Sequence, residues 1–206
     1  MTVLHSAAVY STPEVIRLLI DEGADTDPFT AFGFSPLHLA VSYDVAVENI
    51  HALLDGGADI EARMWSTDKQ PDNKGMTPLH AAAAEGAPEA VIALLERGAK
   101  IEATDGQFGI TPLHAAASAS LENTRILIQA GANIKAETKK GETPLHVAVK
   151  AFRIRAEIVN LLLDEGSNPH ARDNNRKTPF DYMKNNKKWL GDTTTYRRLR
   201  QASQGR

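Results

Sequence analysis

The tetrapeptide TPLH stands at residues 77–80 and returns unchanged at 111–114 and 143–146. Related tetrapeptides stand before and after these copies: TVLH begins at residue 2, SPLH at residue 35 and TPFD at residue 178. Successive copies begin 33, 42, 34, 32 and 35 residues apart. A motif that returns at a nearly fixed period of roughly 20 to 50 residues indicates a chain built from stacked copies of one structural unit.

Each copy of the tetrapeptide predicts the start of a short helix. The Thr or Ser hydroxyl can cap a free backbone N–H, and proline is tolerated at the first helical position. Small residues follow, as in LHAAA at 79–83 and again at 113–117. Such residues allow a neighbouring helix to approach closely. The pattern therefore predicts a short first helix in every unit.

A second element follows each start by about 21 residues. Apolar residues with helical spacing end in a glycine, which favours a helix that stops in the left-handed conformation. The copies are LLIDEGAD (18–25), LLDGGAD (53–59), LLERGAK (94–100), LIQAGAN (127–133) and LLDEGSN (162–168). A polar segment with another glycine then predicts a turn before the next start.

These elements, recurring in fixed order, resemble the ankyrin repeat, whose period is about 33 residues and whose pattern includes T-P-L-H-x-A. The resemblance covers nearly the whole chain. It implies an all-α ankyrin-repeat solenoid of about six helix-turn-helix units joined by β-hairpin-like loops. We expect a single domain over residues 1–206, with units at approximately 2–34, 35–76, 77–110, 111–142 and 143–177 and a C-terminal cap at 178–206.

Departures from the repeat mark three special segments. About eight extra residues within Arg63–Pro71 should lengthen the loop after the second unit. Arg176 replaces the turn glycine of the fifth unit, which costs roughly 1 kcal/mol if the turn keeps a positive φ. The last segment predicts a capping helix over residues 193–203, with Tyr196 and Leu199 facing inward and its arginines facing water.

Composition narrows the class of protein. Hydrophobic residues are 42% and charged residues 24% of the 206, which is typical of globular proteins. There is no cysteine, so disulfides and thiolate zinc sites are excluded. No apolar run reaches about 18 residues and no secretory signal is visible, so we expect a cytoplasmic protein without a transmembrane segment. Residues 1–60 carry a net charge of −8 and residues 170–206 a net charge of +7.

The histidines do not predict a metal site. Five of the seven hold one place in the repeat, which separates neighbouring rings by roughly 10 Å, whereas zinc requires donors at about 2.1 Å. The resemblance implies that these side chains bond the start Thr and the turn backbone; they are His5, His38, His80, His114 and His146.

No motif predicts catalysis. GxxxxGK[ST] and GxSxG are both absent. We therefore predict no catalytic residue, no metal, no cofactor and no enzymatic activity. An enzyme whose Ser, His and Asp come together from distant positions is the remaining alternative.

The aromatic residues are the best candidates for binding a partner. In ankyrin stacks the hairpin tips and the exposed face of the first helices form the concave recognition surface, and loop aromatics are common interface anchors. Packing against neighbouring hairpins is the alternative, and it suits Phe29 and Phe34 better than Phe32 and Trp65. The predicted partner-binding residues are Phe29, Phe32, Phe34, Tyr43, Met64, Trp65 and Phe108.

The sequence thus predicts a monomeric, non-catalytic module that binds another protein through hairpin tips and the concave helix face. The alternative is an adaptor or effector whose basic C-terminal cap docks nucleic acid or an anionic surface. No groove-reading motif supports nucleic acid, and a solvated cap would explain the same charges. The cations concerned are Lys184, Lys187, Lys188, Arg197, Arg198 and Arg200.

Overall fold

The chain forms a stack of helices in a computed structural model. The structure describes residues 1–206 except 43–45, 66–74, 86, 152–155, 186–192 and 205–206. Within that part there are twelve helices and no strand. The helices are α1 (Val3–Tyr10), α2 (Pro13–Asp21), α3 (Pro36–Ser42), α4 (Val47–Asp55), α5 (Pro78–Glu85), α6 (Pro88–Glu96), α7 (Pro112–Ala119), α8 (Leu121–Gln129), α9 (Pro144–Lys150), α10 (Ala156–Asp164), α11 (Pro179–Asn185) and α12 (Thr193–Ala202).

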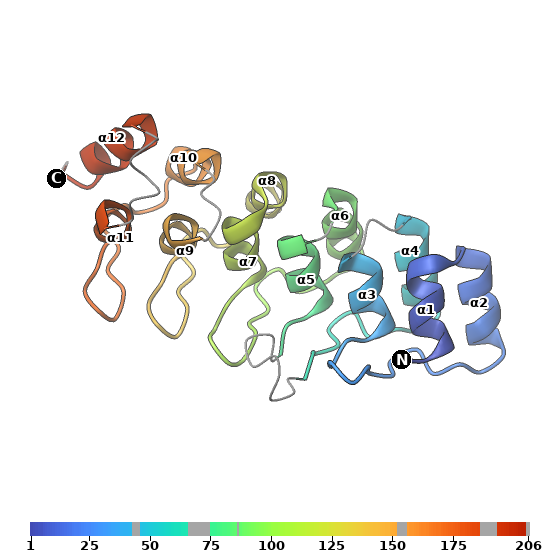
Figure 1. The fold of residues 1–206 in the computed structure, drawn as a ribbon. Coiled ribbons are helices and arrows are strands. Elements are labelled where there is room, and N and C mark those ends of the chain that lie inside the picture. Colours follow the sequence, from blue (N-terminus) through green and yellow to red (C-terminus); the bar gives the residue numbers. More distant parts are fainter. Residues whose placement is uncertain (43–45, 66–74, 86, 152–155, 186–192, 205–206) are drawn as a thin grey trace.

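The helices lie in two rows (Figure 1). The odd-numbered helices, which begin at the repeated tetrapeptide, form one row, and the even-numbered helices form the other. Each helix packs against its own partner and against the same helix of the next unit, as α5 does against α6 and α7. The loops between units project beyond the odd-numbered row on one side of the stack. The predicted all-α ankyrin-repeat solenoid is therefore confirmed.

Local signals place the helix ends where the sequence predicts them. A proline opens α3, α5, α7, α9 and α11. The second helix of each of the first five units ends two residues before a glycine with positive φ. The core between the rows repeats in the same way, with one fully buried leucine near the start of each first helix: Leu4, Leu37, Leu79, Leu113 and Leu145.

The repeated histidine joins each unit to the next. In every case Nδ1 lies 2.8–2.9 Å from the hydroxyl of the start Thr or Ser, whose backbone N–H also points to it. The other nitrogen, Nε2, lies 2.9–3.1 Å from a backbone carbonyl just before the next start. The bonded carbonyls belong to Phe34, Met76, Ile110, Glu142 and Lys177.

This geometry requires a neutral imidazole. A carbonyl only accepts, so Nε2 carries the proton and donates it, and Nδ1 must accept from the backbone N–H of the start residue. Burial favours the same neutral form, because it penalises the charged one. It lowers the pKa of all five histidines, and that of His38 from 6.5 to about 4.

The sixth unit uses a carboxylate at the same place. Asp181 accepts the backbone N–H and the hydroxyl of Thr178, both at 2.9 Å, and so caps α11 as histidine caps the earlier helices. A hydrogen bond from Lys184, together with those from Thr178, lowers the pKa of Asp181 to about 2. The carboxylate has no N–H to donate to a further carbonyl.

The departures predicted for the turns and the cap are largely present. Arg176 has φ +59°, at the register where the other hairpins carry glycine. Most of the enlarged loop at 63–71 lies outside the described residues. In the cap, α12 buries Leu199 and half-buries Tyr196, which packs on Phe180 at 5.3 Å between ring centroids.

One expectation for the cap is wrong. Arg198 does not face water like its neighbours, because it reaches back to α10. Its guanidinium donates to the carboxylate of Asp164 and to the side chain of Asn160. The pair anchors α12 to the preceding unit.

The histidine bonds predict acid-induced loss of stability. Because the folded pKa of His38 lies below its unfolded value, the unfolded chain binds more protons as pH falls from about 6.5 to about 4. At 1.4 kcal/mol per pKa unit, His38 alone should remove about 3 kcal/mol of the free energy of unfolding over this range. Urea unfolding followed by circular dichroism measures it. His38→Asn should show a shallower pH dependence, and an identical slope would contradict the role of His38.

Two glycines with positive φ predict a second effect on stability, which is steric. Gly23 and Gly33 both have positive φ, at 87° and 78°. An added Cβ meets nothing within 4 Å at Gly23, but at Gly33 it would lie 2.0 Å from the carbonyl oxygen of Trp65. Gly23→Ala should therefore cost about 1 kcal/mol of unfolding free energy, and Gly33→Ala at least about 2 kcal/mol, because overpacking adds to strain. Equal losses in chemical unfolding would show that the hairpin of Gly33 and the hairpin of Trp65 do not touch at this point.

Candidate protein-binding surface

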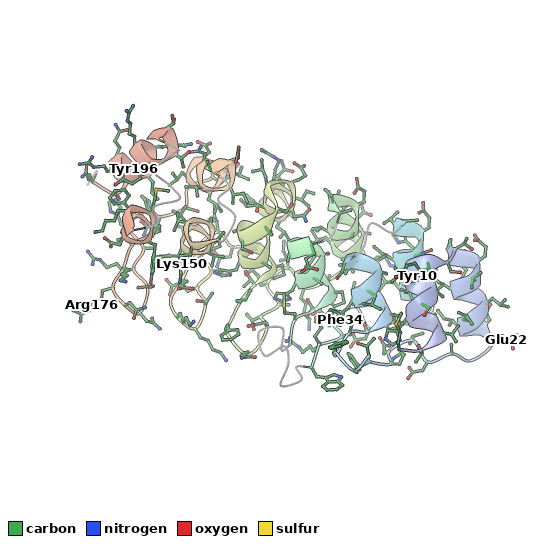
Figure 2. The ribbon with its side chains drawn as sticks, in the orientation of Figure 1. Tyr10, Glu22, Phe34, Lys150, Arg176 and Tyr196 are labelled. Atoms are coloured by element: carbon green, nitrogen blue, oxygen red, sulfur yellow. The ribbon has the colours of Figure 1, made fainter. Side chains whose placement is uncertain are left out.

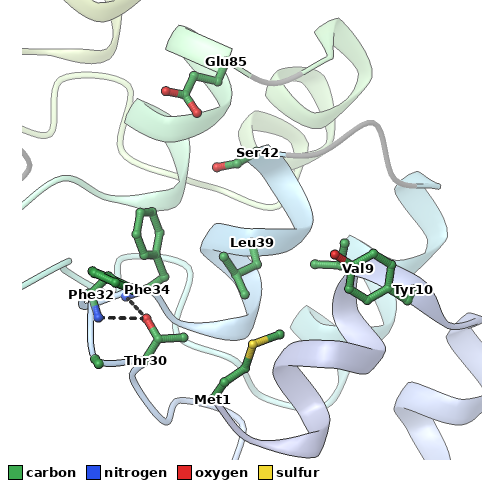
Figure 3. Close-up of a pocket in the computed structure, with 10 residues that line it drawn as sticks. Met1, Val9, Tyr10, Thr30, Phe32, Phe34, Leu39, Ser42 and Glu85 are labelled. Carbon is green, nitrogen blue, oxygen red and sulfur yellow. Dashed lines mark hydrogen bonds between the residues drawn. The ribbon is translucent and has the colours of Figure 1, made fainter.

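A groove of about 580 Å³ opens at the N-terminal end of the odd-numbered row (Figure 3). Its lining comes mainly from α1, α3 and the hairpin that leads from α2 into α3. Val9 and Tyr10 lie at the end of α1, Leu39 lies on α3, and Phe32 and Phe34 come from the hairpin at 30–34. The lining is thus mainly apolar, and Glu85 at the end of α5 is the one carboxylate among the described residues that line it.

The hairpin that carries the two phenylalanines is held by one hydroxyl. Thr30 Oγ1 accepts the backbone N–H groups of Phe32 and Phe34 at 3.3 and 3.1 Å, as Figure 3 shows. The backbone N–H of Thr30 also donates to the Phe34 carbonyl at 2.9 Å. Gly33 lies against the backbone of Trp65, so the first hairpin rests on the second. The tip is therefore fixed before any partner arrives.

The side chains of this groove differ in how deeply they are buried. Phe34 is half-buried and meets the ring of His38 edge-on, with centroids 6.5 Å apart. Phe32 is 51% exposed and Tyr10 is 80% exposed. Large apolar side chains that stay in water at the rim of a groove are typical of binding surfaces.

Three other predicted residues, Phe29, Trp65 and Phe108, are not part of the lining of this groove. Trp65 is exposed on the neighbouring hairpin, and Phe29 is exposed on the approach to the first one. Tyr43 lies outside the described residues. Phe108 is half-buried and lines a second cavity, described below.

The structure corrects the expectation for Met64. Its side chain is only 3% exposed, so it cannot serve as a surface anchor. The reason lies in the hairpin: the N–H of Met64 donates to the carbonyl of Met76, and its carbonyl accepts from Gly75. Met64 therefore belongs to the paired stem of the enlarged loop, where its side chain points into the protein.

The residues predicted from the sequence to bind a partner do not include Tyr10, Leu39 or Glu85 of this groove. A signal for Leu39 was available, because it is the fifth residue of its unit. At this register the other units carry Ser6, Ala81, Ala115, Val147 and Tyr182. Leu39 and Val147, the two branched aliphatic residues at this place, line the two cavities.

The second cavity, of about 240 Å³, lies further along the same row. Phe108, Ile110 and Val147 form its apolar part, and Lys140 and Glu142 lie at its polar edge. The ammonium group of Lys140 sits 5.8 Å from the centroid of the Phe108 ring, within the range of a cation–π interaction. The two cavities thus differ in their charged groups: the described lining of the first has a carboxylate, and that of the second has a lysine and a carboxylate.

Neither cavity gathers the groups that metal binding requires. In the described ranges, no three histidine, aspartate or glutamate side chains lie close enough to hold a metal ion. In the five repeated histidines, both ring nitrogens already form hydrogen bonds within the stack. Among the helices that the structure covers, none is long and apolar enough to cross a membrane.

Comparison with known proteins agrees with this geometry. The family model described as "Ankyrin repeats (3 copies)" matches residues 1–64 and 103–173, and the single "Ankyrin repeat" model matches residues 74–106. The B-cell lymphoma 3 protein homolog of Mus musculus is 34% identical over 184 residues, which cover 87% of this chain and 39% of that protein. Ankyrin repeat and SOCS box protein 16 of Mus musculus is 31% identical over 186 residues, with shares of 86% and 39%.

A solved structure shows the same fold. The crystal structure of the ankyrin repeat domain of Bcl-3, titled a unique member of the IkappaB protein family, superposes with a TM-score of 0.72 and 32% identity. The match covers 87% of this chain and 76% of that chain. The chain spans about two fifths of the length of the two curated relatives named above. With the repeat motifs, the two-row stack and these matches in agreement, the chain belongs to the ankyrin repeat family.

Proposed function

We propose that this chain is a non-catalytic protein-binding module that grips a partner protein in the groove between α1, α3 and the hairpin at 30–34. The proposal rests mainly on the exposure of Phe32 and Tyr10 at the rim of a groove whose interior is apolar. Ankyrin repeats generally mediate protein–protein interaction, which supports a protein as the ligand.

The groove is preorganised for binding. The hydrogen bonds of Thr30 and the contact between Gly33 and Trp65 fix the hairpin. A rigid surface loses little conformational entropy when a partner arrives, so more of the contact energy becomes affinity. Phe32 and Trp65 lie on these two touching hairpins and are the proposed anchors, with Tyr10 at the far rim.

The alternative that the basic cap docks an anionic surface finds less support. Lys187 and Lys188 lie outside the described residues. Of the other predicted cations, Lys184 pairs with Asp181 and Arg198 pairs with Asp164. This leaves Arg197 and Arg200 exposed on α12. The cytoplasmic location and the monomeric state stay predictions.

Removing the two anchors should weaken binding without unfolding the stack. We expect Phe32→Ala and Trp65→Ala each to cost at least about 1 kcal/mol of binding free energy, as interface hot spots do. Thermal unfolding should hardly change, because both side chains are largely in water. Partners captured from the native host by the unaltered protein, then titrated by calorimetry against each variant, provide the measurement.

Two exposed apolar residues on the other row serve as matched controls. Leu18 on α2 is 59% exposed and Ile92 on α6 is 42% exposed, close to the values of the proposed anchors. Leu18→Ala and Ile92→Ala should leave the affinity unchanged. If these variants weaken binding as much as Phe32→Ala does, the partner sits on the even-numbered row and the proposal is wrong.

A further inference from the structure

The hairpin tips of the last units carry a concentration of positive charge that is separate from the cations predicted in the cap. We name this the cationic tip surface: Lys139, Lys140, Arg172, Arg176 and Lys177, all exposed. At the tips of the first hairpin, residues 30–34, there is no charged residue. Among the described residues, the two C-terminal hairpins thus carry five cations, whereas the first hairpin tip carries none (Figure 2, where Arg176 is labelled).

The two hairpins that form this surface are joined to one another. The backbone N–H of Asn174 donates to the Lys140 carbonyl at 2.9 Å, and its side-chain amide donates to the Lys139 carbonyl at 2.9 Å. The cations of the two hairpins therefore lie along one continuous edge.

Aromatic rings and backbone groups restrain several of these charges. Lys140 lies over Phe108, and the ammonium group of Lys177 lies 5.2 Å from the centroid of the Tyr182 ring. The ammonium group of Lys139 donates to the carbonyl of Gly106. Lys150 also approaches Tyr182, but Glu142 pairs with it. Restraint of this kind reduces the entropy that each lysine would lose on meeting an anion.

Arg176 supplies an independent observation. Its φ is +59°, whereas Gly33, Gly75, Gly109 and Gly141 occupy the same register in the other hairpins. Glycine would relieve the backbone at this position. A strained residue whose side chain points into water calls for a functional reason, and the added positive charge at the tip is the property that glycine could not provide.

We propose that the cationic tip surface binds an acidic segment of a partner protein, with an apolar side chain of that segment entering the cavity beside Lys140. Carboxylates interspersed among the cations, Glu137 and Glu142, disfavour a continuous phosphate backbone. The adjoining cavity of about 240 Å³, lined by Ile110 and Val147, has room for one apolar side chain. This surface uses different residues from the groove at Phe32, so it adds a second contact to the proposed function.

A labelled peptide tests the proposal directly. The probe is a fluorescein-labelled heptapeptide EEDLEED, titrated with the full chain by fluorescence anisotropy at low and at physiological ionic strength. We expect saturable binding that weakens with salt, because exposed charge pairs are screened. The same peptide with serine in place of leucine should bind more weakly, since it leaves the cavity empty.

The Arg176→Gly variant tests peptide binding separately from the stability of the fold. The variant should be at least as stable as the unaltered chain in chemical unfolding, yet bind the peptide about threefold more weakly, as loss of an exposed ion pair predicts. Lys140→Glu combined with Lys177→Glu should lower the affinity at least about tenfold and flatten its salt dependence. Arg197→Ala on α12 and Phe32→Ala at the other groove are the controls, and neither should alter peptide binding.

Four results would overturn the proposal. The first is unchanged peptide affinity in both Arg176→Gly and the double lysine variant. The second is equal loss of affinity in Arg197→Ala, which would transfer the site to the cap. The third is tighter binding of a heptathymidylate oligonucleotide than of the peptide at physiological ionic strength, which would make the surface a nucleic-acid site. A loss confined to Phe32→Ala would refute this inference and leave the first groove standing.

Discussion

The stack depends on a buried imidazole that bonds in two directions. Toward its own unit it caps the first helix through the start Thr or Ser, and toward the next unit it donates to a hairpin carbonyl. The leucines and alanines between the rows supply the hydrophobic stabilisation, but they would tolerate small sliding of one unit past another. The directional bond removes that freedom, because a buried carbonyl left without its donor is costly. Each hairpin is thereby placed at a fixed height above the preceding helix.

This fixed placement explains why the loops can serve as a surface at all. Flexible loops of other folds commonly lose conformational entropy when they bind, and this loss lowers their affinity. Here Thr30 ties one tip and Asp105 ties another, the latter by accepting the N–H groups of Phe108 and Ile110 at 3.0 and 2.9 Å. Contacts between neighbouring tips then make a continuous edge, which carries apolar character at one end and positive charge at the other.

The fold could be predicted from the sequence because its information is local and repeated. Thr-Pro-Leu-His marks a helix start by itself, and three copies with two close variants remove the ambiguity of one. The strain at Arg176 was visible for the same reason, as a glycine register lacking its glycine. The candidate site was harder. Met64 and Trp65 are neighbours in the sequence, but strand-like pairing with Met76 turns one inward and leaves the other in water. The bond between Arg198 and Asp164 joins residues 34 positions apart, beyond any local pattern.

The fifth residue of each unit has a consequence for how such a protein diversifies. Leu39 and Val147 line cavities, while Ala81 and Ala115 at the equivalent places of the intervening units line neither of them. The buried leucine two residues earlier is the same in all four units, so the scaffold does not distinguish them. The residue at this register can therefore vary between units while the buried leucine beside it stays the same, so the shape of the row's surface can change without a change in the core.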